Sequence, residues 1–352
     1  MSKSSACTVH RDTSDFRRPP PEVPFSSHGF DNTEIRTHFP DFSHTTATLF
    51  AMIKEQSSCA PCYTVQIHGS HKETERNGNK ETKRTVQDFS LRLNLTDLLA
   101  QTPMESLPNN KRGYRGGIIP MMKPVVGPGG TEDAMDEVHS WCESYVRNPA
   151  AIKSFTLERK ITNHDQKKLE QLLRSAIYET NYKGHVEIKF LSQYTKLIVY
   201  SPGKINEWRT TNWIRWVFYL TFLWIVSWPI LFFLTRKYQV VKVNFQYADV
   251  LKDDGGNRKC AVMSEVEWFN LWESAIKRAA LARMLCEDTF LDDAYRISTA
   301  QADARGLLSS MQPQQQPLTT GNSFADGALS FLGQGLRVAE VWNTSRGWGG
   351  DC

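Results

Sequence analysis

Residues 216–235 read WVFYLTFLWIVSWPILFFLT, twenty consecutive residues without a charged side chain. A helix of this length, at about 1.5 Å of rise per residue, reaches about 30 Å, the thickness of the hydrocarbon core of a bilayer. Arg215 precedes the run, and Arg236 and Lys237 follow it. A buried helix of a water-soluble protein rarely holds so long an apolar stretch, so the run predicts a membrane segment rather than a core helix.

Tryptophans gather in this run and just before it, where five of the ten in the chain lie. Indole rings favour the headgroup level of a bilayer, and basic residues favour its polar edge. We therefore expect this region to anchor the chain in a membrane. The expected anchor residues are Trp208, Trp213, Arg215, Trp216, Trp224, Trp228, Pro229, Arg236 and Lys237.

Pro229 leaves two topologies open for the run. Proline removes a backbone donor and clashes with the preceding turn, so the sequence predicts a kink over residues 226–229. One kinked transmembrane helix would place its two flanks on opposite sides of the bilayer. A re-entrant wedge, with two legs of about ten residues that each reach about 15 Å, would return both flanks to one side. Basic residues occur on both sides of the run, so the orientation rule does not choose between them.

Alternating and helical apolar patterns around the run predict an α+β fold. Strands are expected at residues 63–68, 85–95, 155–161, 185–190, 196–200 and 238–247, and a charged hairpin loop at 71–83. Helices are expected at 131–147 and 164–180, and a third begins with the capping box of Ser264 and Glu267. The strand at 238–247 needs partners, and the nearest are 185–190 and 196–200. Such pairing would favour the wedge, whereas the length of the run favours a single span.

Composition shifts predict the domain organisation. A small mixed α+β domain is interrupted by the membrane segment and carries disordered arms at both ends. The expected parts are 1–60, a disordered proline-containing tail; 61–100, a small β element; 101–130, a Gly/Pro linker; 131–207, the first part of the α+β domain; 208–237, the membrane segment; 238–286, the second part of that domain; and 287–352, a low-complexity tail with a short helix near 324–342.

Charge and cysteine content limit the classes of partner and compartment. The net charge of +4 is small and the basic residues are scattered, so we expect no nucleic-acid partner. Seven cysteines at irregular spacing argue against a disulfide framework and fit a reducing compartment. We therefore expect an intracellular endomembrane, with the α+β unit facing the cytosol.

No catalytic motif is present in the sequence. Cys59 and Cys62 form a CxxC pair, but no second pair completes a zinc site, and a redox pair is expected at a helix N-terminus beside a strand. The nine histidines are dispersed, and there is no phosphate loop, nucleophile elbow, dinucleotide fingerprint or HExxH. We therefore predict no catalytic residue, no cofactor-binding residue, no metal site and no cofactor.

The block WRTTNWIRWVFYLTFLWIVSWPILFFLTRKYQVVKVNF at residues 208–245 resembles a family of uncharacterised filamentous-fungal membrane proteins. The strands at 191–200, the capping box at 264–272 and the Gly-Trp-Gly-Gly-Asp of residues 347–351 fit the same resemblance. It implies a source and a membrane location, but no activity and no site residues.

Two functions remain open from the sequence. The favoured one is a membrane-anchored scaffold or adaptor without enzymatic activity, which binds the lipid bilayer through the apolar run and a protein partner through its α+β unit. The alternative is a membrane-associated enzyme or a lipid-handling protein with no recognisable catalytic motif.

Overall fold

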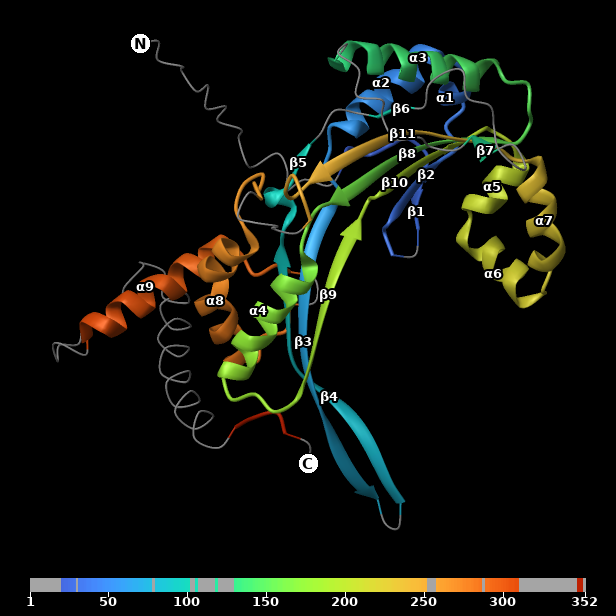
Figure 1. The fold of residues 1–352 in the computed structure, drawn as a ribbon. Helices are drawn as coiled ribbons and strands as arrows, with labels where there is room; N and C mark the ends of the chain where they lie inside the picture. Colours follow the sequence, from blue (N-terminus) through green and yellow to red (C-terminus); the bar gives the residue numbers. More distant parts are fainter. Residues whose placement is uncertain are drawn as a thin grey trace, which may run out of the picture. The chain divides into compact units, whose positions relative to one another are not determined.

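The computed structural model describes residues 20–29, 31–77, 80–101, 105–106, 118–119, 130–251, 258–286, 289–309 and 347–350. The chain is a mixture of helices and two β-sheets, so the predicted α+β class is confirmed (Figure 1). It divides into two compact units. The first consists of Met1–Tyr63, Thr96–His164 and Ser192–Val262, and the second of Thr64–Leu95, Asp165–Leu191 and Met263–Cys352.

The first unit is built on one sheet with the strand order β1-β2-β10-β8-β11-β5, and β6 and β7 also pair with β11. Its central strand β8 lies antiparallel to β10 and parallel to β11. Valine and phenylalanine side chains of β11 are fully buried, as expected for a central strand. The strands are β1 (Ser26–His28), β2 (Glu34–Thr37), β5 (Ala100–Gln101), β6 (Glu105–Ser106), β7 (Ile118–Ile119), β8 (Lys153–Thr162), β10 (Lys196–Tyr200) and β11 (Arg236–Gln246).

The strand β11 was expected at residues 238–247, and the structure confirms a strand there but corrects its partner. The sequence offered 185–190 and 196–200 as the nearest candidates. Instead it pairs with β8. The strand at 196–200 is β10, which lies on the other side of β8, and the strand at 185–190 belongs to the second sheet. Alternation predicts that a strand forms, but it does not specify the neighbour with which the strand pairs.

Helices α1 (Asp41–His44), α2 (Thr46–Ser57) and α3 (Gly130–Arg147) complete the first unit. Leu49 and Ile53 of α2 and Val138 and Tyr145 of α3 are fully buried. The expectation of a disordered tail over 1–60 is therefore wrong for the part that holds β1, β2, α1 and α2, while residues 1–19 lie outside the described residues. Two short strands and a weakly amphipathic helix give little periodic signal. Of the strands, β2 pairs with β10, far away in the sequence, and β1 pairs with β2.

The second unit contains the sheet β4-β3-β9, made of β3 (Cys62–Asn77), β4 (Lys80–Asn94) and β9 (His185–Gln193), and a 3₁₀ turn at Thr96–Leu98 follows β4 in the first unit. The predicted strands at 63–68 and 85–95 lie in β3 and β4. The predicted loop at 71–83 is wrong, because the paired register continues from Thr64 opposite Asn94 to Asn77 opposite Lys80. Cross-strand pairing thus extends through residues whose polar composition suggested a loop.

Helices α4 (Gln166–Glu179), α8 (Glu265–Leu281) and α9 (Asp293–Ser309) belong to the second unit. The predicted capping box of α8 is confirmed. The Ser264 hydroxyl accepts from the Glu267 N–H at 3.2 Å, and the Glu267 carboxylate accepts from the Ser264 N–H at 2.8 Å. The bond from the Ser264 N–H, together with one from the Ser264 hydroxyl at 3.0 Å, lowers the pKa of the Glu267 carboxyl. Beyond the cap, α8 buries Trp268, Phe269 and Trp272 along one face.

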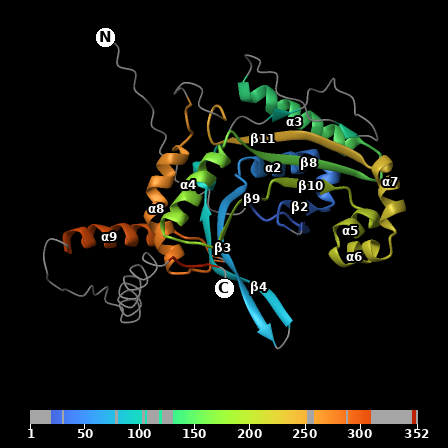
Figure 2. The same ribbon diagram turned by 60° about the horizontal axis from the view of Figure 1, so that its bottom comes forward.

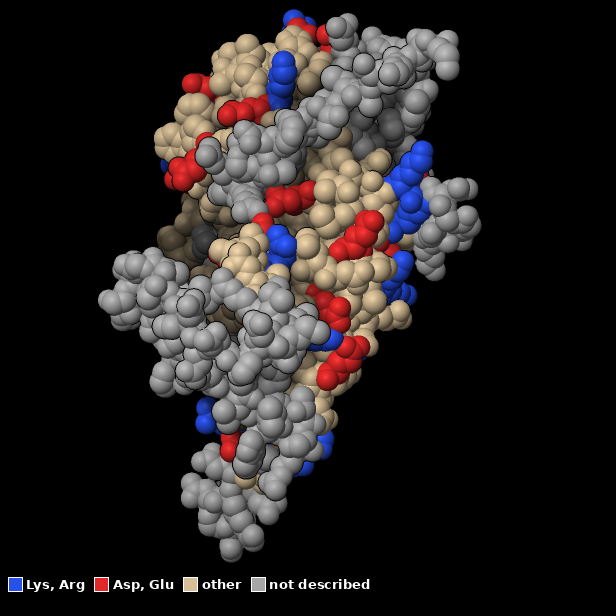
Figure 3. All heavy atoms as spheres, turned by 90° about the vertical axis from the view of Figure 1, so that its left-hand side faces the viewer, with Lys and Arg blue, Asp and Glu red and all other residues tan. Residues whose placement is uncertain are grey.

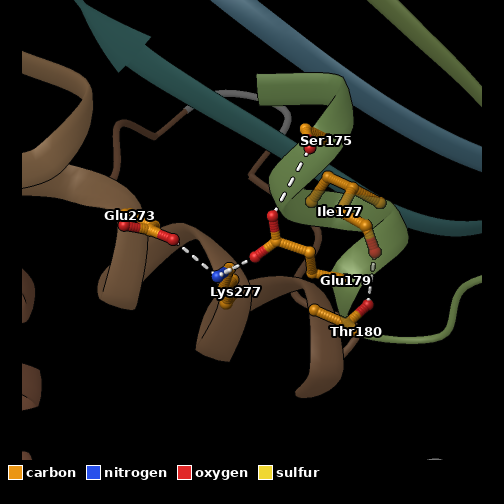
Figure 4. A network of polar contacts seen from close by, with 6 residues as sticks. All are labelled: Ser175, Ile177, Glu179, Thr180, Glu273 and Lys277. Carbon is orange, nitrogen blue, oxygen red and sulfur yellow. Dashed lines mark hydrogen bonds and ion pairs between the residues drawn. The ribbon is translucent and has the colours of Figure 1, made fainter. Parts of the chain in front are cut away.

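Ion pairs join α4 to α8 at the surface of the second unit (Figure 4). The Lys277 ammonium donates to Glu179 of α4 and to Glu273 of its own helix, each at 2.6 Å. Acidic and basic side chains are interspersed on the face drawn in Figure 3, rather than gathered by sign. Exposed pairs of this kind contribute at most about 1 kcal/mol each, so the packing of α4 against α8 rests mainly on buried apolar side chains.

Two further predictions concern segments that lie partly outside the described residues. Helix α9 forms within the tail expected to be of low complexity at 287–352, whereas the short helix predicted near 324–342 lies outside the described residues. The Gly/Pro linker predicted at 101–130 also lies mostly outside them.

Candidate membrane-docking hairpin

The apolar run does not form one continuous helix. It divides into α6 (Asn212–Leu220) and α7 (Trp224–Leu234), preceded by the short α5 (Lys204–Thr210). Among the described residues, no helix combines the length and the apolar character that crossing a bilayer requires. The run thus forms two helices of nine and eleven residues, in place of the one kinked helix that was one of the two topologies left open by the sequence.

A tight turn at residues 221–223 separates the two helices. Thr221 ends α6, and both its N–H and its hydroxyl donate to the carbonyl of Val217, at 3.0 and 2.7 Å. Phe222 then adopts a left-handed backbone with φ of 57°. Its carbonyl accepts from the Ile225 N–H at 3.2 Å as α7 begins. A left-handed residue directly after a helix reverses the chain, so the two helices form a hairpin.

Pro229 does not cause the break. The kink was expected over 226–229, but Pro229 lies at the middle of α7, and the helix continues through it. The missing N–H deprives only the carbonyl of Ile225 of its helical donor. The left-handed turn several residues earlier changes the direction of the chain instead.

Both ends of the hydrophobic segment attach to the same end of the same sheet. Tyr200, the last residue of β10, lies opposite Ser154, and Arg236, the first residue of β11, lies opposite Lys153. The two strands flank the beginning of β8, so the chain leaves the sheet and returns to it two strand spacings away. Helices α5, α6 and α7 lie beyond this end of the sheet (Figures 1 and 2).

Buried polar side chains fix the base of the hairpin. The Ser201 N–H donates to the Lys153 carbonyl at 3.0 Å, and the Lys153 N–H donates to the Ser201 hydroxyl at 3.2 Å. The Asn206 amide of α5 donates to both oxygens of Ser201, at 2.8 and 2.9 Å. Asn206 is 1% exposed and Thr235, at the other end, is fully buried. The Asn206 Oδ1 is buried without a hydrogen-bond partner in the described part of the chain. The bonds made by its Nδ2 and by Ser201 still give the hairpin a defined point of departure.

Lys153 also joins this base to α3. Its ammonium donates to the carbonyls of Tyr145, Val146 and Asn148, at 2.7, 3.1 and 2.9 Å. These carbonyls lie at the C-terminal end of α3, where helical donors are missing and a positive charge is favoured. Burial lowers the pKa of Lys153. No sequence pattern marked Lys153, Ser201 or Asn206, because their partners come together only when the sheet forms.

The hairpin presents large apolar side chains to solvent. Trp213 and Trp216 on α6 are 67% and 61% exposed, and Trp208 and Trp224 are 49% and 45% exposed. The other exposed apolar side chains of the hairpin are Val217, Tyr219, Leu220, Phe222, Leu223, Ile225, Val226, Ile230 and Leu234. Contiguous apolar surface of this extent marks an interaction site on a folded protein.

The remaining predicted anchor residues have mixed positions. Arg236 is exposed at the start of β11, and Lys237 and Pro229 are half-buried. Arg215 belongs to α6 and Trp228 to α7, but their side chains lie outside what the structure describes. The structure thus places the four described tryptophans on the hairpin or in its base helix α5.

The CxxC pair joins α2 to β3. Cys59 follows α2 and its thiol donates to the Glu55 carbonyl at 3.6 Å, while Cys62 is the first residue of β3. Neither cysteine forms a disulfide. Within the described ranges, no group of three or more His, Cys, Asp or Glu side chains is placed to hold a metal ion. The pair therefore connects two elements and gathers no further ligands in the described part of the chain.

Comparisons with known proteins add no relative: no family model, no curated protein and no solved structure matches this chain. The resemblance to filamentous-fungal membrane proteins stays a prediction, and the hairpin is the feature from which a function can be argued.

Proposed function

We propose that the protein is a monotopic membrane-anchored scaffold, which inserts the α6–α7 hairpin into one leaflet and keeps its α+β units on one side. The observation that carries the proposal is the common origin of β10 and β11 beside β8, combined with the exposed apolar surface of the hairpin between them. A segment that leaves a sheet and returns to it beside the same strand is suited to dip into a bilayer rather than to cross it.

The dimensions of the hairpin fit one leaflet. Its legs of nine and eleven residues reach about 14 and 16 Å, roughly half the hydrocarbon core. Each large apolar side chain that moves from water into lipid contributes about 1.5–3 kcal/mol. The exposed side chains of the hairpin therefore supply enough free energy for stable docking, even after the cost of immobilising the protein on a surface.

The polar flanks fit the headgroup region. Trp208 and Trp213 lie toward the base of the hairpin, where indole rings favour the interface, and Arg236 lies at the return to the sheet. The described cysteines, Cys59, Cys62, Cys142, Cys260 and Cys286, form no disulfide, which fits a reducing compartment. These features support a cytosol-facing location on an intracellular membrane.

A bypass variant tests the anchor. Strands β10 and β11 lie about 9.5 Å apart across β8, a gap that a four-residue Gly-Ser linker of about 13 Å can span. Residues 203–234 are replaced by this linker, and both proteins are floated with neutral and anionic vesicles on a density gradient. We expect the full chain to float with both vesicles. The bypass variant should stay in the dense fraction, with a circular dichroism spectrum that loses only the helical signal of α5, α6 and α7.

The proposal fails if the folded bypass variant floats as well as the full chain, or if the full chain does not float. Topology is tested separately, by protease protection of tags at both termini in sealed microsomes. Both tags are expected to be cleaved together or protected together, and opposite fates would contradict the wedge.

The scaffold role is tested by proximity labelling in cells. We expect the full chain to label a reproducible set of partner proteins, and the bypass variant to lose those that depend on membrane location. The absence of any reproducible partner would contradict a scaffold. The alternative of a membrane-associated enzyme or lipid-handling protein would then be tested by metabolite and lipid profiling of a deletion strain.

A further inference from the structure

A short stretch at residues 347–350 lies in the second unit, although 37 residues outside the described ranges separate it from the end of α9. Its tryptophan, Trp348, is only 4% exposed. The Trp348 N–H donates to the carbonyl of Asn181 at 3.2 Å, and its carbonyl accepts from the Lys183 N–H at 2.8 Å. The Trp348 main chain therefore pairs with the turn after α4, in a parallel bridge with Tyr182.

Aromatic side chains surround the indole ring. The Tyr182 ring lies 4.5 Å from it between centroids, and the Phe89 ring lies at 5.7 Å. The Arg283 guanidinium lies 5.7 Å from the ring centroid. The indole N–H donates to the carbonyl of Thr180 at 3.0 Å. The site thus offers the indole apolar contacts, a cation and a hydrogen-bond acceptor together.

The glycines beside Trp348 are required by the geometry. Gly349 has a φ of 67°, and a Cβ placed on it would overlap the ring of Tyr182. Gly347 has a φ of 77°, and a Cβ there would meet the Lys183 side chain. A Cβ on Gly350 would make only an ordinary contact, 3.9 Å from the Lys183 Cβ. The site therefore requires glycine at positions 347 and 349, but it leaves room for a Cβ at position 350.

Tyr182 is itself held in place by a buried carboxylate. Its hydroxyl donates to Asp88 at 2.8 Å, and the Asp88 carboxylate also pairs with His71 Nδ1 at 2.9 Å. The Asp88 side chain is 2% exposed. Burial raises the pKa of Tyr182, as does its bond to Asp88, so the hydroxyl remains a donor. The ring against which the indole packs is therefore oriented by residues outside the 347–350 segment.

We propose that the turn at 181–184, with Phe89 and Asp88, is a peptide-recognition site selective for a tryptophan flanked by glycines, which residues 347–350 of this chain occupy reversibly. Main-chain hydrogen bonds supply affinity, and the aromatic cage and the missing Cβ atoms supply selectivity, as in other peptide-binding sites. A tethered segment faces its site at an effective concentration in the millimolar range, so a weak intrinsic affinity is sufficient to keep it bound.

The test supplies the segment as a separate peptide. A fluorescein-labelled peptide of residues 345–351, blocked at both ends, is titrated into the full-length chain and into its Trp348→Ala variant, with fluorescence anisotropy as the readout. We expect the variant to bind the peptide and the unaltered chain to bind it at least about tenfold more weakly, because its own segment competes. A peptide with Gly349→Ala should lose binding, whereas the matched Gly350→Ala peptide should bind within about twofold.

Three results would overturn the proposal: a folded Trp348→Ala variant that does not bind the peptide, equal binding to both chains, or equal binding of the two alanine peptides. Amide hydrogen exchange of the unaltered chain gives an independent test, because the Lys183 N–H is bonded to the Trp348 carbonyl. We expect it to exchange faster than amides within α4, through opening of the segment alone. Exchange only on global unfolding, or a Trp348→Ala variant that cannot fold, would make the segment a fixed part of the core.

Discussion

Helices α7 and α8 are both rich in large apolar residues, but they differ in where those residues can be buried. Helix α8 confines Trp268, Phe269 and Trp272 to one face, and all three are less than 9% exposed. Helix α7 is apolar around nearly its whole circumference, and the side chains of Trp224, Ile225, Val226, Ile230 and Leu234 are 45–63% exposed. An amphipathic helix buries its apolar face within its own unit, whereas a helix that is apolar on all sides leaves apolar surface for another apolar environment.

The largest expected effect comes from placing charge near the tip of the hairpin. Leu220→Asp with Leu223→Asp should cost up to about 5–7 kcal/mol of transfer into lipid, because each buried carboxylate costs about 2.5–3.5 kcal/mol. Flotation with vesicles should therefore be lost. Leu271→Asp, on an exposed position of α8, is the matched control and should float like the unaltered chain. Equal flotation of the two variants would remove the distinction between the helices.

The next largest effect is expected on the free energy of unfolding rather than on lipid binding. Trp272→Ala on α8 should lower the free energy of unfolding by about 3–5 kcal/mol, because it empties a buried site. Trp216→Ala on the hairpin should change it by no more than about 0.5 kcal/mol in the absence of vesicles. Urea titration followed by circular dichroism measures both, and a large loss in the second variant would mean that the hairpin packs against the protein.

A substitution of Lys153 tests how much the base of the hairpin contributes to the free energy of unfolding. Lys153→Met should lower the free energy of unfolding by about 1–3 kcal/mol, since it leaves carbonyls of α3 without their donor. Lys167→Met, at an exposed position of α4, serves as the control.

The same substitution carries a pH signature. Burial lowers the pKa of Lys153 below its usual value of 10.5, so the unfolded chain binds more protons between the two values. Stability conferred by Lys153 should therefore rise with pH through this window, and the gap between the two proteins should widen. A gap that narrows on urea titration at rising pH would refute this role.

The smallest effect concerns the turn. Phe222 holds a left-handed backbone that costs a non-glycine residue about 1 kcal/mol or more, so Phe222→Gly should be more stable than Phe222→Ala by about that amount. Both variants lack the aromatic ring, so their difference isolates the backbone. Equal thermal midpoints would indicate that α6 and α7 do not meet in this turn.

The sequence predicted the elements of this fold better than their partners. The capping box of α8 and the alternation of β8, β10 and β11 are local signals, and each lies where it was expected. The pairing of β11 with β8 is not local, because β10 and β8 alternate equally well and nothing in the pattern ranks one above the other. The N-terminal strands were missed for the same reason, since β2 is defined by its pairing with β10.

For the hairpin, the sequence predicted the apolar surface and, as one of two open topologies, two legs of about ten residues, but not the position of the turn. The uncharged run and its tryptophans were visible at once. A kink was expected over 226–229, because proline disrupts helices. The chain turns at Phe222 instead, and this residue type does not predict a turn. The base residues Asn206 and Lys153 are ordinary polar residues in the sequence, and they become notable only when the sheet brings them to one place. The docking of Trp348 beside Tyr182 was likewise invisible to local patterns.

The parallel pairing of β8 with β11 has a consequence for biosynthesis. During translation β8 emerges first, and its second neighbour follows only after about seventy further residues that include the whole hairpin. One edge of β8 therefore stays unpaired until the apolar hairpin has left the ribosome. If the segment inserts into lipid as proposed above, insertion can therefore begin before β8 and β11 pair.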